Sequence, residues 1–205
     1  MTRLTKRLVV PFAASLAAAL LMLGTLTFAQ AFEIGDDGLH KESWFSLTFN
    51  DIAEDIEAAR KAGKRLVIVV EQRGCIYCKE VHETVLTVPE VRDYIKEHFM
   101  VVQYNIHGSE DLTDLDGETL SEKRAAKKWR LLFTPTILFM PEDVPTDGSD
   151  AGQAAVAMMP GAFKKGTFLE MFVWVNDKGY EGDEDFQTYY NRRWREKHGS
   201  DEPAD

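Results

Sequence analysis

The chain has two cysteines, Cys75 and Cys78, which are separated by only two residues. They closely follow an apolar, β-branched run, residues 66–70, and precede a segment whose apolar residues repeat at helical spacing. This order of strand, cysteine pair and helix predicts that Cys75 lies at the amino end of a helix. The helix dipole and the free N–H groups of that end stabilise a thiolate. The pattern therefore predicts a reactive dithiol within an α/β framework.

A structural disulfide and a zinc site are the alternatives for this pair. A tetrahedral zinc site needs further ligands, and the sequence offers no second cysteine pair. Exported proteins that depend on disulfides usually carry an even set of dispersed cysteines, whereas this chain has both in one tight pair. Redox chemistry is favoured, with Cys75 as the nucleophile and Cys78, one turn inside the helix, as the resolving thiol.

Residues 1–31 have the pattern of a secretory signal peptide. Basic residues within positions 3–7 precede an apolar run, 8–28, which ends at the small-x-small sequence Ala29-Gln30-Ala31. An uncleaved membrane anchor is the alternative, because the run is near the lower length limit of a spanning helix. Polar residues weaken the end of the run, so cleavage before Phe32 is favoured. We expect a periplasmic protein without stable membrane association after cleavage.

Removal of this segment would leave 174 residues with 21 basic and 34 acidic side chains, which changes the formal net charge from −10 to −13. So acidic a chain argues against nucleic acid and anionic membranes as partners. The length suits one domain with a sizeable core, which we expect to span residues 32–197. A charged, disordered tail is expected from residue 198 to 205.

The remaining patterns predict alternating helices and strands. Helices are expected at 52–62, 76–86, 89–98, 122–129 and 164–175, and strands at 65–70, 99–105, 131–140 and 154–159. Residues 107–119, rich in Gly, Ser, Asp and Thr, predict a polar surface insertion. Pro135 falls inside a β-like run, which predicts a strand that begins at a bend, with a cis bond as one option. Four aromatic residues predict an amphipathic C-terminal helix docked on the core: Phe186, Tyr189, Tyr190 and Trp194.

The sequence resembles the SoxW-like periplasmic thioredoxins associated with bacterial sulfur oxidation. The resemblance covers about Trp44 to Tyr190, and one departure is Ile76, where proline is common in the family. The motifs that carry it are Glu71-Gln72-Arg73-Gly74-Cys75-Ile76-Tyr77-Cys78-Lys79-Glu80-Val81-His82-Glu83, Val101-Val102-Gln103-Tyr104-Asn105, Gly117-Glu118 with Ser121-Glu122-Lys123, Phe133-Thr134-Pro135-Thr136, and Met159-Pro160-Gly161 with Phe168-Leu169.

The resemblance implies an α/β thioredoxin fold with a central mixed β-sheet flanked by helices. It also implies a cis-Pro135 loop that faces the dithiol, where the backbone of Thr134 pairs with a substrate strand; an ordinary turn proline is the alternative. Threonine before this proline resembles reductases and isomerases more than strong oxidases. Tyr77, between the cysteines, is a candidate apolar contact for partners or simply an exposed spacer.

By the same resemblance the protein is an exported thiol–disulfide oxidoreductase that reduces protein or small-molecule disulfides. Its electrons would come from a membrane thiol donor, its target would be an oxidised cysteine of the sulfur-carrier machinery, and no cofactor is expected. A disulfide oxidase or isomerase would use the same residues in reverse.

Glu71 is the candidate proton acceptor of the resolving step. Many thioredoxins keep a buried aspartate six residues before the first cysteine, where this chain has Val69. Glu71 lies on the same strand face two residues later, and a carboxylate near a dithiol is expected to titrate high. A solvated glutamate at the strand end is the alternative.

His82 shares one helical face with Cys75 and Cys78, which permits a non-catalytic Cu(I) site made of the three residues. A histidine that merely flanks the active helix is the more common arrangement, so no metal site is predicted. His107, in the insertion, is a further candidate ligand, although nothing in the spacing requires it. Residues 123–128 form a small basic face, for which a solvated surface is favoured over partner docking.

Overall fold

The structure is a computed structural model, and it describes residues 33–199. The expected signal peptide, 1–31, lies outside the described residues, as do residues 200–205 of the expected tail. Among the residues described, no helix has both the length and the apolar character that crossing a membrane requires.

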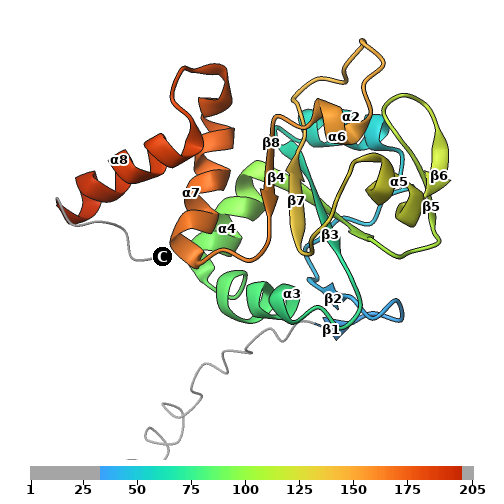
Figure 1. The fold of residues 1–205 in the computed structure, drawn as a ribbon, viewed down its shortest axis with the longest axis horizontal. Helices are drawn as coiled ribbons and strands as arrows, with labels where there is room; N and C mark the ends of the chain where they lie inside the picture. The colour runs from blue at the N-terminus through green and yellow to red at the C-terminus, as the bar shows by residue number, and fades with distance from the viewer. Residues whose placement is uncertain (1–32, 200–205) are drawn as a thin grey trace, which may run out of the picture. The chain divides into compact units, whose positions relative to one another are not determined.

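A four-stranded mixed sheet forms the centre of the fold (Figure 1). Its order is β4 (Phe99–Asn105), β3 (Arg65–Glu71), β7 (Thr136–Phe139) and β8 (Ala157–Pro160). β3 runs parallel to β4 and antiparallel to β7, and β8 is antiparallel to β7. Every residue of β3 is buried, as expected of an apolar, β-branched strand covered on both faces. The predicted α/β class with a central mixed sheet is confirmed.

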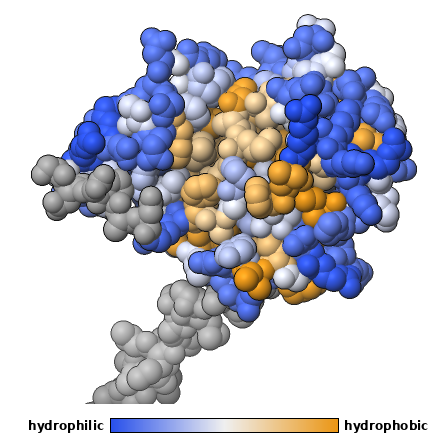
Figure 2. Space-filling model, viewed as in Figure 1, coloured by the Kyte–Doolittle hydropathy of each residue, from blue (hydrophilic) through white to orange (hydrophobic). Residues whose placement is uncertain are grey.

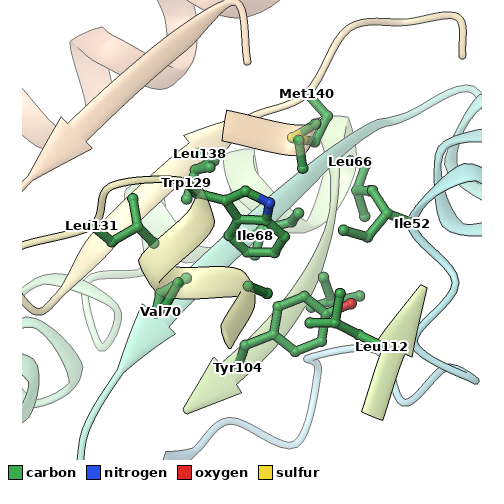
Figure 3. Close-up of a cluster of buried hydrophobic side chains, with 14 of the residues drawn as sticks. Ile52, Leu66, Ile68, Val70, Tyr104, Leu112, Trp129, Leu131, Leu138 and Met140 are labelled. Atoms are coloured by element: carbon green, nitrogen blue, oxygen red, sulfur yellow. The ribbon is translucent and has the colours of Figure 1, made fainter. Parts of the chain in front are cut away.

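The side chains of β3 alternate between two cores, one on each face of the sheet. Leu66, Ile68 and Val70 belong to the first core, which α2 (Ile52–Lys61), α5 (Glu122–Lys128) and α6 (Ala151–Ala154) cover (Figure 3). Val67 and Val69 belong to the second core, which α4 (Pro89–His98) and α7 (Lys165–Asn176) cover. The helix that carries the cysteines joins the second core, so its position depends on that packing.

Three of the helix ends carry residues that suit their positions. The side chain of Asp51 accepts a hydrogen bond from the N–H of Glu54 (3.0 Å) and caps α2. Gly63 has φ +69°, a conformation that favours glycine, directly after the helix. Pro89 occupies the first turn of α4, where its missing N–H costs nothing.

The insertion at 107–119 contains more structure than predicted. Two short strands, β5 (Asp111–Thr113) and β6 (Thr119–Ser121), form an antiparallel hairpin. Leu112 and Leu120 are buried in the first core, and the indole of Trp129 donates a hydrogen bond to Asp114 (2.9 Å). The segment is therefore anchored in the core and is not merely a surface loop.

Residues at both ends of the described chain add further elements. β1 (Glu33–Ile34) and β2 (His40–Lys41) form a hairpin before α2, which the sequence patterns did not predict. After α7 come a short 3-10 helix, η3 (Gly179–Glu181), and the predicted amphipathic helix, α8 (Phe186–His198). Phe186, Tyr189 and Tyr190 lie against aromatic neighbours, with Trp174 of α7 among them.

Candidate active site

Cys75 and Cys78 form a disulfide at the start of α3 (Ile76–Glu80). Cys75 is the residue that caps the helix, and its sulfur accepts a hydrogen bond from the N–H of Cys78 (3.0 Å). Gly74, directly before it, has φ +71°, so the sharp turn from β3 into the helix suits glycine. The structure therefore places the first sulfur at the amino end of a helix, where the dipole favours its thiolate.

The two sulfurs differ in access to solvent. Cys75 is 5% exposed, whereas Cys78 is fully buried. The residues between them face outward, with Ile76 71% and Tyr77 56% exposed. A partner can therefore reach Cys75 but not Cys78.

The loop before β7 lies against Cys75. The carbonyl oxygen and the hydroxyl oxygen of Thr134 each lie 3.5 Å from the sulfur of Cys75, and the Thr134–Pro135 peptide bond is cis. The two residues before Thr134 are exposed and apolar: Leu132 is 81% and Phe133 is 64% exposed. Figure 2 shows hydrophobic residues over this loop and over β7 and β8, with hydrophilic residues on either side.

Glu71, the last residue of β3, is 1% exposed. Its Oε1 accepts a hydrogen bond from Nε2 of His82 (3.1 Å), and its Oε2 accepts one from Nε2 of Gln103 (2.9 Å). The alternative of a solvated glutamate at the strand end is therefore wrong. The carboxylate is held inside the protein by two donors.

His82 lies between two carboxylates. Its side chain is fully buried, and its Nδ1 forms a second hydrogen bond, to Oε1 of Glu42 (2.8 Å). Burial lowers the pKa of His82, but the hydrogen bonds and charges of Glu42 and Glu71 outweigh this effect and raise it to about 9. His82 is thus an imidazolium at neutral pH, with both N–H groups donating.

This arrangement does not favour the Cu(I) alternative. Both ring nitrogens of His82 face carboxylates, so neither is directed at the sulfurs. Within residues 33–199, no group of three or more His, Cys, Asp or Glu side chains is arranged to hold a metal ion.

Gln103 connects this buried cluster to the N-terminal hairpin. Its amide donates to the backbone carbonyl of His40 (2.8 Å) as well as to Glu71, and its Oε1 accepts from Lys41 (2.9 Å). Lys41 in turn pairs with Asp37 (2.6 Å). A continuous hydrogen-bonded network thus joins β2, β4 and β3 to the dithiol helix.

The helix changes its hydrogen-bond pattern at His82. Residues Val81–Val85 form a π-helical turn, η2, in which the N–H of Leu86 donates to the carbonyl of Val81 (2.9 Å). Such wide turns often occur at functional sites. Cys78 and His82 lie four residues apart on either side of the change, and both are fully buried.

Sequence reasoning missed Glu42 and Gln103. Gln103 did leave a signal, since it is a polar residue that directly follows the apolar start of β4. Glu42 left none, because its partner is 40 residues away in the chain.

The structure also places the two remaining candidates, His107 and the basic face of α5. Nε2 of His107 bonds to Oε1 of Gln72 (3.1 Å), so it contacts the loop before Cys75 and not the sulfurs. The basic face of α5 is partly neutralised: Lys128 pairs with Asp114, Asp116 and Glu118, and Arg124 with Glu118.

Residues 52–172 match the family described as a thioredoxin-like domain, which is more than half of the chain. No curated protein matches the chain. Among solved structures, the chain is similar to a thioredoxin-fold protein from Helicobacter pylori, with 23% identity, a TM-score of 0.54, and coverage of 74% of this chain and 92% of that one. This likeness concerns the fold alone.

Two further structures align at lower scores. A thioredoxin from Thermus thermophilus shares 23% identity over 62% of this chain and 84% of its own, with a TM-score of 0.47. The oxidised C-terminal domain of DsbD from Neisseria meningitidis shares 20% identity over 60% of this chain and 90% of its own, with a TM-score of 0.39.

Proposed function

Because this chain belongs to the thioredoxin-like domain family, we propose that it is a thiol–disulfide oxidoreductase whose reacting atoms are the sulfurs of Cys75 and Cys78. One observation carries the proposal: the disulfide lies at the amino end of α3, with Cys75 5% exposed and Cys78 fully buried. This asymmetry gives the two sulfurs different tasks.

In the reductive direction, the thiolate of Cys75 attacks a substrate disulfide. A Cys75–substrate bond forms, the substrate S–S bond breaks, and the released substrate thiolate takes a proton from solvent. Cys78 then loses its proton and attacks the sulfur of Cys75. The electron pair of the mixed disulfide leaves with the substrate sulfur, so the substrate gains two electrons and the protein ends in the disulfide form of this structure.

We assign the contact surface for the substrate to the residues that frame Cys75. Ile76 and Tyr77 follow it, and Leu132 and Phe133 precede Thr134, which touches its sulfur. Four exposed apolar side chains beside a reactive sulfur suit an extended, partly apolar segment of a protein, with the backbone of Thr134 as its pairing partner.

More specifically, we propose an exported reductase that is linked to bacterial sulfur oxidation and receives its electrons from a membrane thiol donor. The motif resemblance and Thr134 before the proline support reduction as the direction of the reaction. Residues 1–31 support export to the periplasm. The N-terminal sequence of the exported protein tests export with cleavage. It should begin at Phe32, and a chain that still carries residues 1–31 would contradict cleavage.

The dithiol potential against glutathione, combined with an insulin-reduction assay, tests the reductase. A potential near that of thioredoxin, about −270 mV, together with insulin reduction supports it. A potential near that of DsbA, about −120 mV, without insulin reduction would favour the oxidase instead.

Two cysteine variants test the oxidoreductase itself. Cys75→Ser should abolish turnover, and Cys78→Ser should also abolish it while trapping a mixed disulfide on Cys75. Turnover that survives either substitution would overturn the proposal.

A further inference from the structure

A groove leads away from the dithiol toward the C-terminal helix. Its near half, a hollow of about 470 Å³, begins at Tyr77 and runs along the outer side of α3 and η2 to Lys165. Its far half, a hollow of about 370 Å³, lies between β8 and α8. Both halves are lined by Ala162, Phe163 and Lys164, so they adjoin at this loop.

The far half is built for apolar side chains. β8 contributes Met158 and Met159 to its lining, α8 contributes Phe186 and Tyr190, and α7 contributes Met171. Methionine side chains adapt to ligands of varied shape, and aromatic rings provide large apolar contact areas. Met158 is 37% exposed, and Figure 2 shows the hydrophobic surface over β8.

β8 is also the last strand of the sheet. β7 pairs with one side of β8, and within residues 33–199 no strand pairs with the other side. An edge strand beside a hollow is a common binding place for an extended segment, which can add to the sheet through its backbone.

The near half carries charge. Lys164 lines both halves and Lys165 lines the near half. Both side chains are exposed, and Glu80 is the one acidic residue among the lining residues of the near half. Two lysines on a chain with net charge −10 would attract an acidic side chain of a bound segment to this point.

The wall formed by α8 lies outside residues 52–172, the part of the chain that matches the family. The groove is therefore assembled from the common domain and from an element added to it. Its near end opens at Tyr77, which lies between the two cysteines in the sequence.

We propose that this groove holds the segment of a protein disulfide substrate that adjoins its reacting cysteine. An acidic residue of the segment meets Lys164 and Lys165, and an apolar residue farther along enters the hollow between β8 and α8. This inference rests on the proposed function. It adds that the enzyme selects protein substrates by sequence beyond the disulfide.

Two peptides with the same disulfide test the groove, one short and one extended by a segment that contains Asp, Leu and Phe. The unmodified protein should reduce the extended peptide with a KM at least tenfold lower than that of the short one. Met158→Glu should raise the KM for the extended peptide about tenfold and leave kcat, and the reduction of oxidised glutathione, unchanged. Leu47→Glu is the matched control, because Leu47 is fully exposed and lies outside the groove.

A charge reversal guards against a variant that merely folds badly. Lys165→Glu should weaken binding of the Asp-containing peptide and strengthen binding of the same peptide with Lys in place of Asp. Equal KM values for both peptides in every variant would overturn the groove while leaving the oxidoreductase intact. A protein that reduces neither peptides nor oxidised glutathione would instead overturn the proposed function.

Discussion

His82 carries a positive charge inside the protein, and its two carboxylate partners make this possible. A buried charge is costly unless it is paired and hydrogen-bonded, and both N–H groups of His82 have such a partner in Glu42 and Glu71. His82 thus connects the helical segment that carries the cysteines to β3 and to the segment directly after β2.

The raised pKa of His82 makes stability depend on pH. The pKa in the folded protein is about 9, above the ordinary 6.5, so the folded state binds the proton more tightly. The stabilisation is complete below about pH 6.5 and is lost as pH rises through about 9. We expect the free energy of unfolding to fall by roughly 3 kcal/mol between pH 6 and pH 10 because of this residue.

Urea unfolding at a series of pH values measures this effect. His82→Gln should be less stable at pH 6, and its stability should change less than that of the unmodified protein up to pH 10. Parallel curves for the two proteins would contradict the assignment.

Glu71 is proposed to take the proton of Cys78 in the resolving step. Glu71→Gln keeps the size of the side chain but removes the base, so mixed-disulfide resolution should slow by on the order of 100-fold. Single-turnover kinetics with quenched samples measure the step, and Glu83→Gln, at an exposed glutamate of η2, is the control. Unchanged kinetics in Glu71→Gln would remove Glu71 from the mechanism.

Among single residues, the sequence predicted those whose role depends on neighbours close to them in the chain. The spacing of Cys75 and Cys78 and the strand before them are enough to place the dithiol. The partners of Glu71 could not be predicted in the same way, because Gln103 is 32 residues away and meets it through the pairing of β3 with β4.

At the scale of the elements, one carboxylate fastens α8 to α7. Glu170 of α7 is 6% exposed, and it accepts hydrogen bonds from Tyr189 (3.2 Å), Arg193 (3.4 Å) and Lys197 of α8. Burial raises the pKa of Glu170, but the hydrogen bond and charge of Lys197 and the charge of Arg193 outweigh it and lower the pKa below its ordinary value. The side of the groove that α8 forms depends on these contacts between α7 and α8.

Glu170→Gln should loosen α8, because it removes the negative charge that three partners share. We expect a loss of stability of about 1–2 kcal/mol and faster amide hydrogen exchange over residues 186–198. Glu184→Gln, which removes a partly exposed partner of Arg192, should have a much smaller effect on stability. Equal exchange in both variants would contradict the role of Glu170.

The sequence predicted the long elements more closely than the short ones. The boundaries of α4 and β4 agree with prediction, because a proline, a helical period and a β-like run mark them. β5 and β6 have three residues each, too few to show a period, and they form because Leu112 and Leu120 reach the first core. The strand expected at 154–159 begins later, at Ala157, because α6 takes the residues before it.

At the scale of the whole fold, two cores lie on opposite faces of one sheet, and stability depends on both. Leu138, in β7, is fully buried in the first core. The alternation of β3 between the cores explains why its run is apolar throughout, a pattern that alone predicted a central strand. The groove could not be predicted, because it depends on how α8 docks beside β8.

Leu138→Ala should destabilise the protein by about 3–4 kcal/mol, through lost burial and the cavity that remains. Denaturant unfolding measures the change, and Leu47→Ala, at a fully exposed position, should change stability by less than about 0.5 kcal/mol. Similar losses for both variants would mean that the first core does not contain Leu138.

The wide turn at Val81–Val85 holds one residue more than an α-helical turn. The N–H of Leu86 donates to the carbonyl of Val81, five residues earlier, where an α-helix would use the carbonyl of His82. Deletion of an exposed residue of this turn, such as Glu83, should be absorbed by a return to α-helical bonding. A further inserted residue would instead turn Val85 and Leu86, now 3% and 5% exposed, away from the second core, so this part of the chain should accept shortening more readily than lengthening.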